Sequence, residues 1–202
     1  MVRSFLLVLL STTVVTAGQS AKTLKVDPAS SQVTILVGKG GAFGFAGHEH
    51  EVVAPAVGGA VSLDEGDLTR SSVTLEFDAA ALKVTGKGEP AKDVPEVQRV
   101  MLSERVLDVK KFPKIVFKSR SIKVTKGANA DSTLVIVGDL TLHGQTRPIE
   151  VPTRVTLAGG KVAAKGSFEI KQTAFGIVPV SAAGGTVRVK DAVTVTFSFN
   201  AR

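Results

Sequence analysis

The sequence contains no cysteine, no tryptophan and no tyrosine, and only three histidines and two methionines among its 202 residues. Without cysteine, the chain cannot form a disulfide framework, a cysteine-ligated zinc site, an iron–sulfur cluster, a c-type haem attachment or a thiol nucleophile. Three histidines are too few for most multi-metal enzymes. The aromatic residues are ten phenylalanines. An interior that they line therefore has no phenol or indole to orient a polar ligand.

The sequence also lacks an uninterrupted apolar run long enough to cross a bilayer as a helix. The short apolar segment Phe5–Leu10 follows the positive charge of Arg3, and Val15-Thr16-Ala17 has the pattern of a cleavage site. These features predict a secretory signal peptide over residues 1–17, with a retained N-terminal anchor as the alternative. Export of a chain without cysteine is typical of the bacterial periplasm. We expect no integral membrane segment in the mature chain.

Positive charge exceeds negative charge, with a formal net charge of +7, but the lysines do not form one cluster. The segment Lys110–Lys114 is the locally dense one. Since an exported protein rarely meets nucleic acid, we expect no nucleic-acid partner. The scattered charge favours a solvated outer face, and attraction to anionic lipid headgroups is the alternative.

Strict alternation of apolar and polar residues dominates the chain after residue 20. In the last segment Val193, Val195 and Phe197 fall on one face, while Thr194 and Thr196 fall on the other. This period of two is typical of a half-buried strand. The same pattern predicts strands at about 31–38, 71–78, 115–124, 132–142, 147–157, 161–170 and 187–200, with at least one more between about 48 and 63.

Short turn signals separate these strands, and Gly159-Gly160 predicts a tight hairpin. Gly138 interrupts an alternating run, which indicates a bend or a close approach to the backbone. One segment has helical spacing, at about 94–104, with Asp93 as a candidate N-cap and Glu96 three residues later. The sequence therefore predicts an all-β antiparallel barrel or sandwich with one short helix near one end.

A second helical turn is expected around Lys171–Phe175. The chain shows no internal repeat and no linker that would mark a second domain.

The most conspicuous polar cluster is His48-Glu49-His50-Glu51. In a strand, His48 and His50 point to the same face and could ligate zinc, copper or nickel, with His143 as a third ligand if the fold brings it close. The spacing is not that of zinc proteases. Surface histidines at a loop-to-strand junction and a headgroup-binding role are the other two readings. We expect no resident metal, and keep His48 and His50 as the candidate ligands.

His143 directly precedes a glycine between two apolar runs, which predicts a turn residue whose ring satisfies nearby backbone groups. No Gly-x-Ser-x-Gly elbow accompanies it. We therefore expect no catalytic residue, no cofactor and no enzymatic activity.

Several motifs, taken in order and spacing, resemble those of the YceI-like family of bacterial periplasmic, polyisoprenoid-binding proteins. The resemblance covers residues 23–202. The motifs that carry it are Asp27-Pro28-x-x-Ser31-x-Val33-x-Ile35, Phe112-Pro113-x-Ile115-x-Phe117-x-Ser119, Gly138-x-Leu140-Thr141-Leu142-His143-Gly144-x-Thr146-x-Pro148, Phe175-Gly176-Ile177 and Val189-x-Asp191-x-Val193. The chain departs from the family at Leu24, where an aromatic residue is common, and in the loop that carries His48 and His50.

The resemblance implies an extended lipocalin-like antiparallel β-barrel whose elongated apolar cavity holds a long isoprenoid chain or another amphiphile without covalent chemistry. The protein would then serve as a periplasmic carrier, storage or sequestration protein. A metal-binding or stress-protective protein that uses His48 and His50 is the alternative. The expected partner is an apolar, amphiphilic or fatty-acid-like small molecule, and a homodimer is left open.

Alternation indicates which side chains point inward and therefore which would line such a cavity, with ordinary core packing as the alternative. The candidate ligand-binding residues are Ile35, Val37, Phe43, Phe45, Leu75, Phe77, Ile115, Phe117, Leu140, Leu142, Phe175, Phe197 and Phe199.

Overall fold

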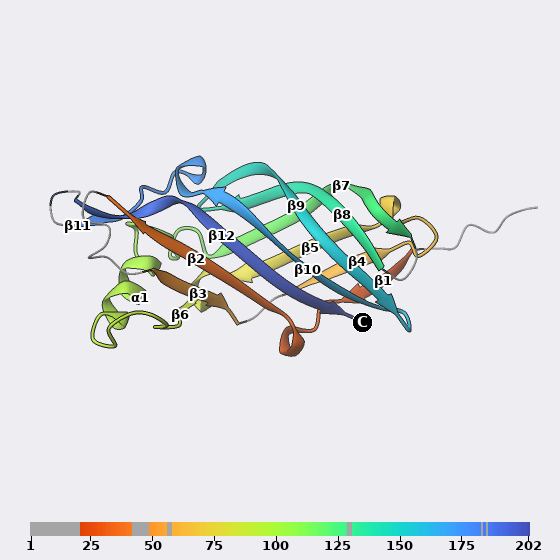
Figure 1. The fold of residues 1–202 in the computed structure, drawn as a ribbon, viewed down its shortest axis with the longest axis horizontal. Coiled ribbons are helices and arrows are strands. Elements are labelled where there is room, and N and C mark those ends of the chain that lie inside the picture. The colour runs from red at the N-terminus through yellow and green to blue at the C-terminus, as the bar shows by residue number, and fades with distance from the viewer. Residues whose placement is uncertain (1–20, 42–48, 56–57, 129–130, 183, 185) are drawn as a thin grey trace, which may run out of the picture.

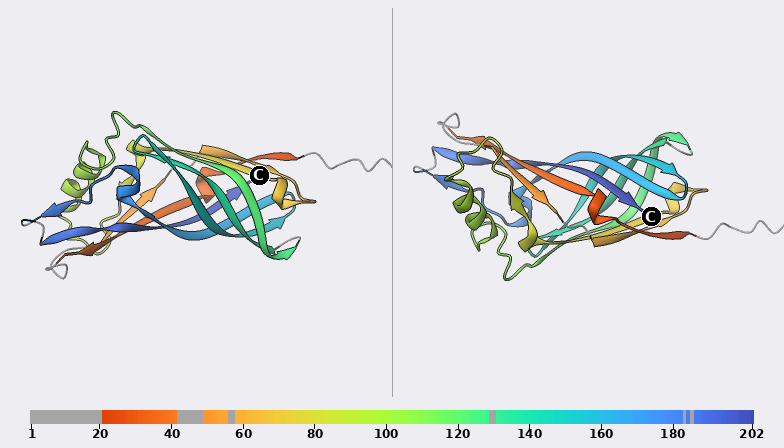
Figure 2. Two further views of the ribbon diagram at one scale, coloured as in Figure 1. Left: turned by 90° about the horizontal axis from the view of Figure 1, so that it is seen from above. Right: turned by 90° about the horizontal axis from the view of Figure 1, so that it is seen from below.

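The alternating segments fold into strands that pair antiparallel throughout the computed structural model, which describes residues 21–41, 49–55, 58–128, 131–182, 184 and 186–202. The predicted signal peptide, residues 1–17, lies outside the described residues. The strands wrap around one long axis, and the helix α1 (Val94–Leu102) lies at one end of it (Figures 1 and 2). In the described part of the chain, no helix has the length and apolar character needed to cross a membrane.

The predicted strands are all present. In chain order the strands are β1 (Lys22–Lys25), β2 (Gln32–Gly40), β3 (His50–Ala54), β4 (Gly58–Leu63), β5 (Ser72–Asp78), β6 (Lys83–Val84), β7 (Lys114–Ala128), β8 (Asp131–Leu142), β9 (Gln145–Ala158), β10 (Lys161–Lys171), β11 (Ser181–Ala182) and β12 (Val187–Ala201). The short strands β1, β6 and β11 were not predicted, because two to four residues are too few to show a period.

The sheet order follows the chain in a meander from β4 through β5, β7, β8, β9 and β10 to β12. The last strand then returns to the beginning of the chain. β12 pairs with β2, Val26 forms a β-bridge with Ala201, and the backbones of Lys25 and Arg202 exchange hydrogen bonds of 2.9 and 3.0 Å. The contacts of Val26 and Lys25 join β1, at one end of the strand order, to β12, and so curl the sheet into the barrel that the family resemblance implied; β2, β3 and β6 continue the sheet from β12.

Turn chemistry sets the ends of the long strands. Gly159 and Gly160 have φ of 56° and 71° and link Ala158 to its partner Lys161, which is the predicted two-residue hairpin. Three 3₁₀ turns begin with an aspartate whose carboxylate accepts a backbone N–H two residues later. These turns are η1 (Pro28–Ser30, capped by Asp27), η3 (Leu68–Arg70, capped by Asp67) and η4 (Ala79–Ala81, capped by Asp78).

α1 confirms the predicted helix, but the predicted cap at Asp93 is wrong. Asp93 is itself in the helical region, at φ −89° and ψ −24°, and its side chain makes no capping hydrogen bond. A preceding turn, in which the Asp93 N–H donates to Pro90 O, leads the chain directly into the helix. An N-cap side chain needs an extended backbone to reach back to the first N–H groups, so the cap does not form. Glu96 instead pairs with Arg99 at 2.6 Å.

The pairing of strands in the barrel wall is interrupted beside α1. β6 pairs with β3, whereas β7 pairs with β5 and β8, so none of the described strands lies on the other side of β6. The side chain of Gln98 on α1 takes that place. Its Oε1 accepts the Val84 N–H at 2.8 Å, and its Nε2 donates to Leu82 O at 2.9 Å. At this end of the barrel, helix side chains replace part of the strand ladder.

Candidate functional site

A cavity of about 280 Å³ extends along the interior of the barrel. Its wall comes from side chains on the inward face of nearly every long strand, and Met101 of α1 with Val106 and Leu107 adds residues from the helix end. At the opposite end the lining includes Leu63, the last residue of β4, and Leu68, the first residue of η3. Ligand pockets have volumes of roughly 300–1,000 Å³, so the volume of this cavity lies just below that range.

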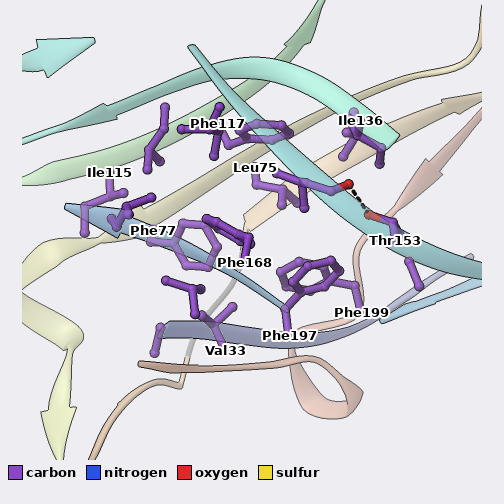
Figure 3. Close-up of a pocket in the computed structure, with 18 of the residues that line it drawn as sticks. Val33, Leu75, Phe77, Ile115, Phe117, Ile136, Thr153, Phe168, Phe197 and Phe199 are labelled. Carbon is purple, nitrogen blue, oxygen red and sulfur yellow. Dashed lines mark hydrogen bonds between the residues drawn. The ribbon is translucent and has the colours of Figure 1, made fainter. Parts of the chain in front are cut away.

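Ten of the predicted wall residues do line the cavity, and Figure 3 shows several of them projecting inward from different strands. The ten are Ile35, Val37, Leu75, Phe77, Ile115, Phe117, Leu140, Leu142, Phe197 and Phe199. Two more, Phe43 and Phe45, lie outside the described residues. The period of two therefore identified the inward face correctly wherever it could be followed.

Phe175 is the exception among the predicted wall residues. It is 1% exposed but does not line the cavity. It lies in the 3₁₀ turn η5 (Gln172–Phe175), which confirms the predicted helical turn. Inward and outward faces alternate only along a strand, so that rule does not place a side chain in a turn. Phe175 packs beneath a shallow surface depression instead, together with Phe112 and His143.

Phe168 lines the cavity but was not among the predicted residues. Its ring lies 6.4 Å from that of Phe197, which in turn stacks on Phe199 at 5.2 Å (Figure 3). These separations are typical of attractive aromatic pairs. The signal was present in the sequence, because Phe168 alternates with polar neighbours on the same face as Ile170.

Gly138 makes room for one wall residue. A Cβ at this position would lie 2.6 Å from Cζ of Phe117 and 2.6 Å from Lys118 O, closer than real Cβ atoms approach other atoms. The predicted close approach at Gly138 is therefore that of a phenyl ring on the neighbouring strand β7. The ring can lie against the backbone of β8 only because this position carries no side chain.

Four polar side chains occur in the lining: Ser71, Ser72, Thr153 and Gln172. Three of them are engaged within the protein. The Thr153 hydroxyl donates to Val151 O at 3.0 Å, Gln172 Nε2 donates to Lys190 O at 2.8 Å, and Ser71 Oγ accepts the Asp64 N–H at 2.9 Å. Internal hydrogen bonds thus leave a largely carbon-lined interior, which suits an apolar chain rather than a polar substrate.

His143 contacts two segments that are distant from it in the chain, the 3₁₀ turn η5 and the residues just before β7. It occupies the first position of the β8–β9 turn with φ 50°, and Gly144 follows with φ 70°. Its Nδ1 lies 3.2 Å from Phe175 O, and its ring meets Phe112 edge-on at 4.8 Å. Since a carbonyl only accepts, Nδ1 carries the proton. The prediction of a turn histidine whose ring satisfies a backbone group is confirmed.

His50 does not assemble a metal site with the other described residues. Its Nδ1 lies 3.1 Å from Oε1 of Glu89, whose side chain is fully buried. Glu51 instead accepts hydrogen bonds from Thr85 and Lys87, and His48 lies outside the described residues. Among the residues that the structure describes, no three metal-ligating side chains gather. The pair His50–Glu89 joins the start of β3 to the loop before α1.

Residues 24–201 match the family model of the YceI-like domain. A UPF0312 protein of Pseudomonas savastanoi is 36% identical over 93 residues, which are 46% of this chain and 42% of the relative. A UPF0312 protein of Pseudomonas putida is 43% identical over 54 residues. The matched segments thus span less than half the length of these curated relatives.

Two solved structures have the same fold. Burkholderia cenocepacia BcnA has a TM-score of 0.68 at 21% identity and covers 88% of this chain and 99% of its own. A polyisoprenoid binding domain from Saccharophagus degradans, described as implicated in plant cell wall breakdown, has a TM-score of 0.64 at 11% identity, over 91% of this chain and 99% of its own. At these identities the likeness shows the barrel fold.

Proposed function

Because the chain belongs to the YceI-like domain family, we propose that it binds a long-chain isoprenoid or another amphiphilic lipid in the barrel cavity, without covalent chemistry. One observation carries the proposal. The barrel keeps an elongated cavity of about 280 Å³ whose wall is made almost entirely of aliphatic and phenyl groups. A protein core of ordinary density would fill that space with side chains.

The energetics favour an occupant with a long hydrocarbon chain. Burial of apolar surface contributes about 25 cal/mol per Å², so a chain that buries about 400 Å² gains about 10 kcal/mol. Association and chain ordering cost a comparable amount, roughly 4–15 kcal/mol. A long apolar tail is therefore needed for tight binding, and a short or polar molecule would not offset the cost. The polar end of the ligand would remain near one end of the barrel.

The biological role that fits this site is that of a carrier, storage or sequestration protein in the periplasm, after removal of residues 1–17. The described part of the lining contains no pairing of a nucleophile with a base, and its polar groups mostly form hydrogen bonds with backbone atoms. A non-enzymatic role is consistent with this wall. The name of the Saccharophagus degradans domain, which refers to polyisoprenoid binding, supports the ligand class.

Among the residues that the structure describes, no contact favours a metal-dependent role. His50 faces Glu89, and neither residue lines the cavity. The experiment for the proposed function also tests this alternative. In native mass spectrometry of protein purified from its own host, a bound mass of several hundred daltons supports the lipid. A metal adduct that disappears in His48→Ala or His50→Ala supports the alternative.

A matched pair of variants tests the location of the ligand. Ile35 lines the cavity, whereas its neighbour Leu36 is on the outer face and 41% exposed. Ile35→Phe places a larger group in the cavity and is expected to lower the affinity for a fluorescent fatty acid or prenol at least 10-fold. Leu36→Phe adds the same ring outside and is expected to leave affinity unchanged. Equal affinity in both variants would place the lipid elsewhere.

A further inference from the structure

The outer face of the barrel carries a row of unpaired cations across four neighbouring strands. Arg154 on β9 lies directly opposite Lys165 on β10. On the other side of Arg154, the register continues through Thr133 on β8 to Lys126 on β7. All three cations are exposed. We call Lys126, Arg154 and Lys165 the basic row.

The basic row lacks the carboxylate partners that several described surface cations have. Arg120 lies 2.7 Å from Asp139, Lys114 lies 2.7 Å from Glu76, and Arg202 lies 3.0 Å from Asp27. No described carboxylate forms an ion pair with a member of the basic row.

The neighbouring rows do not neutralise this charge. Among the described residues of β7 to β10, one carboxylate lies at the positions next to the basic row. It belongs to Asp131, which already accepts a hydrogen bond from the Thr156 hydroxyl at 2.6 Å. Two further exposed cations lie near the basic row. They are Lys123, on β7, and Lys161, at the start of β10. Around the basic row, the described residues of β7 to β10 therefore place five cations beside one carboxylate, while the exposed Glu150 and Glu169 lie further along β9 and β10.

This arrangement disfavours the folded state. Like charges directly opposite each other on one face of an antiparallel pair destabilise it, and Cβ atoms in such positions are about 4.5–5.5 Å apart. An anionic surface laid against β7 to β10 would relieve the repulsion and engage all three charges at once. A planar array of negative charge matches a row of cations that spans about 14 Å, the width of three strand spacings.

We propose that the basic row docks the barrel on the surface of a bilayer rich in anionic phospholipids, from which the protein collects or to which it delivers its lipid. The inference rests on the proposed function for the choice of a bilayer as the anionic partner. Basic residues near an anionic membrane attract it independently of one another and are screened by salt. Removal of each charge is expected to weaken binding about five-fold.

The test uses the full chain and vesicles of defined composition. The wild type is expected to co-sediment with phosphatidylglycerol vesicles at low salt and not to bind phosphatidylcholine vesicles. It should be released from the phosphatidylglycerol vesicles in about 1 M salt, where the Debye length is about 3 Å. The triple variant Lys126→Gln/Arg154→Gln/Lys165→Gln is expected to bind roughly 100-fold more weakly, from three such losses.

The control variant is Lys87→Gln/Arg99→Gln/Lys114→Gln, which removes the same net charge from cations that face Glu51, Glu96 and Glu76. It is expected to keep vesicle binding within about three-fold of the wild type. Absence of wild-type binding to phosphatidylglycerol vesicles would overturn the proposal. So would equal losses in the two triple variants, or binding of short double-stranded DNA as tight as that of vesicles.

A second readout separates this inference from the proposed function. Affinity for a water-soluble fluorescent fatty acid reports on the cavity and is expected to be the same in the wild type and in the basic-row variant. Vesicle docking without fatty-acid binding would refute lipid binding in the cavity but leave the docking surface standing. Fatty-acid binding with no docking would refute the docking surface alone.

Discussion

Gly166 on β10 lies directly opposite Phe197 on β12, and the phenyl ring of Phe197 occupies the space that a side chain at residue 166 would need. A Cβ at Gly166 would lie 2.7 Å from Cζ of Phe197 and would also collide with Pro152 O. The glycine is thus required for space. It lets the ring lie flat against the wall, which keeps the middle of the cavity open.

The variant Gly166→Ala is therefore expected to destabilise the protein by about 1–3 kcal/mol, the usual cost of overpacking. It should also weaken lipid binding, because the displaced ring of Phe197 moves into the cavity. Gly58→Ala is the matched control, since its Cβ would lie at an ordinary 3.5 Å from Glu76 O. Urea unfolding measures both variants. If the stability of Gly166→Ala stays within about 0.5 kcal/mol of the wild type, the usual range for a neutral surface substitution, this account is contradicted.

Truncation of phenylalanine distinguishes a cavity wall from a packed core. Phe175 is fully buried outside the cavity, so Phe175→Ala is expected to lose about 3–5 kcal/mol. Phe77 and Phe117 face space that is already open on one side. Phe77→Ala and Phe117→Ala should each cost less than Phe175→Ala in the ligand-free protein and should mainly weaken lipid binding. Thermal unfolding with and without a fatty acid gives both quantities. Equal large losses in all three variants, with no lipid ever detected, would leave the fold but remove the cavity site.

Gln98 is expected to control the attachment of α1. Gln98→Ala leaves the half-buried N–H of Val84 without its acceptor, at a cost of about 1–3 kcal/mol. Because the contact is local, amide hydrogen exchange should rise over residues 94–102 more than in the long strands. Arg99→Ala removes an exposed partner of Glu96 on the same helix and should change exchange little. Uniform acceleration across the barrel in Gln98→Ala would argue against a local role.

Asp191 is expected to make stability depend on acid pH. Hydrogen bonds from the backbone N–H and the hydroxyl of Thr173 hold the pKa of its carboxyl below the ordinary value, with help from Lys171. As pH falls, the unfolded state therefore takes up this proton first. The contribution of Asp191 is fully present above the unfolded pKa of about 3.9 and is lost as pH falls through the folded pKa.

The wild type should accordingly lose more stability than Asp191→Asn between about pH 5 and pH 2, and the two curves should converge in acid. Shifts in the pKa of Asp67 and Glu96 are common to both proteins and cancel in the difference. Denaturant unfolding across this range measures the difference. A constant gap between the two curves would show that the ionised form of Asp191 does not matter.

Much of the site was predictable because it is built from long strands. Ile115, Phe117, Phe197 and Phe199 alternate with polar residues, and each lines the cavity as expected. The errors fall where the period stops. Phe175 lies in a 3₁₀ turn, and Asp93 enters α1 from a preceding turn, so neither position follows from spacing along the chain.

Contacts between distant segments needed the structure. Glu89 is 39 positions from His50 and carries no sequence signal that would identify it as the partner. Alternation along β10 puts Phe168 on the inward face of its strand, but the pairing of β10 with β12 is needed to bring its ring next to that of Phe197. The basic row was hidden for the same reason, since its members are 28 and 11 positions apart and meet through strand register.

The sequence by itself determined the strands, the turns between them, the face of each strand that is buried and the absence of thiol chemistry. These properties depend on side-chain period and residue type, which are local. Tertiary structure alone decided that the sheet closes, that its interior stays partly open, and which charges lie side by side on the outside. Closure and register depend on pairing between residues far apart in the chain. The open interior depends on side-chain volumes summed around the whole barrel, with glycines beneath the rings of Phe117 and Phe197.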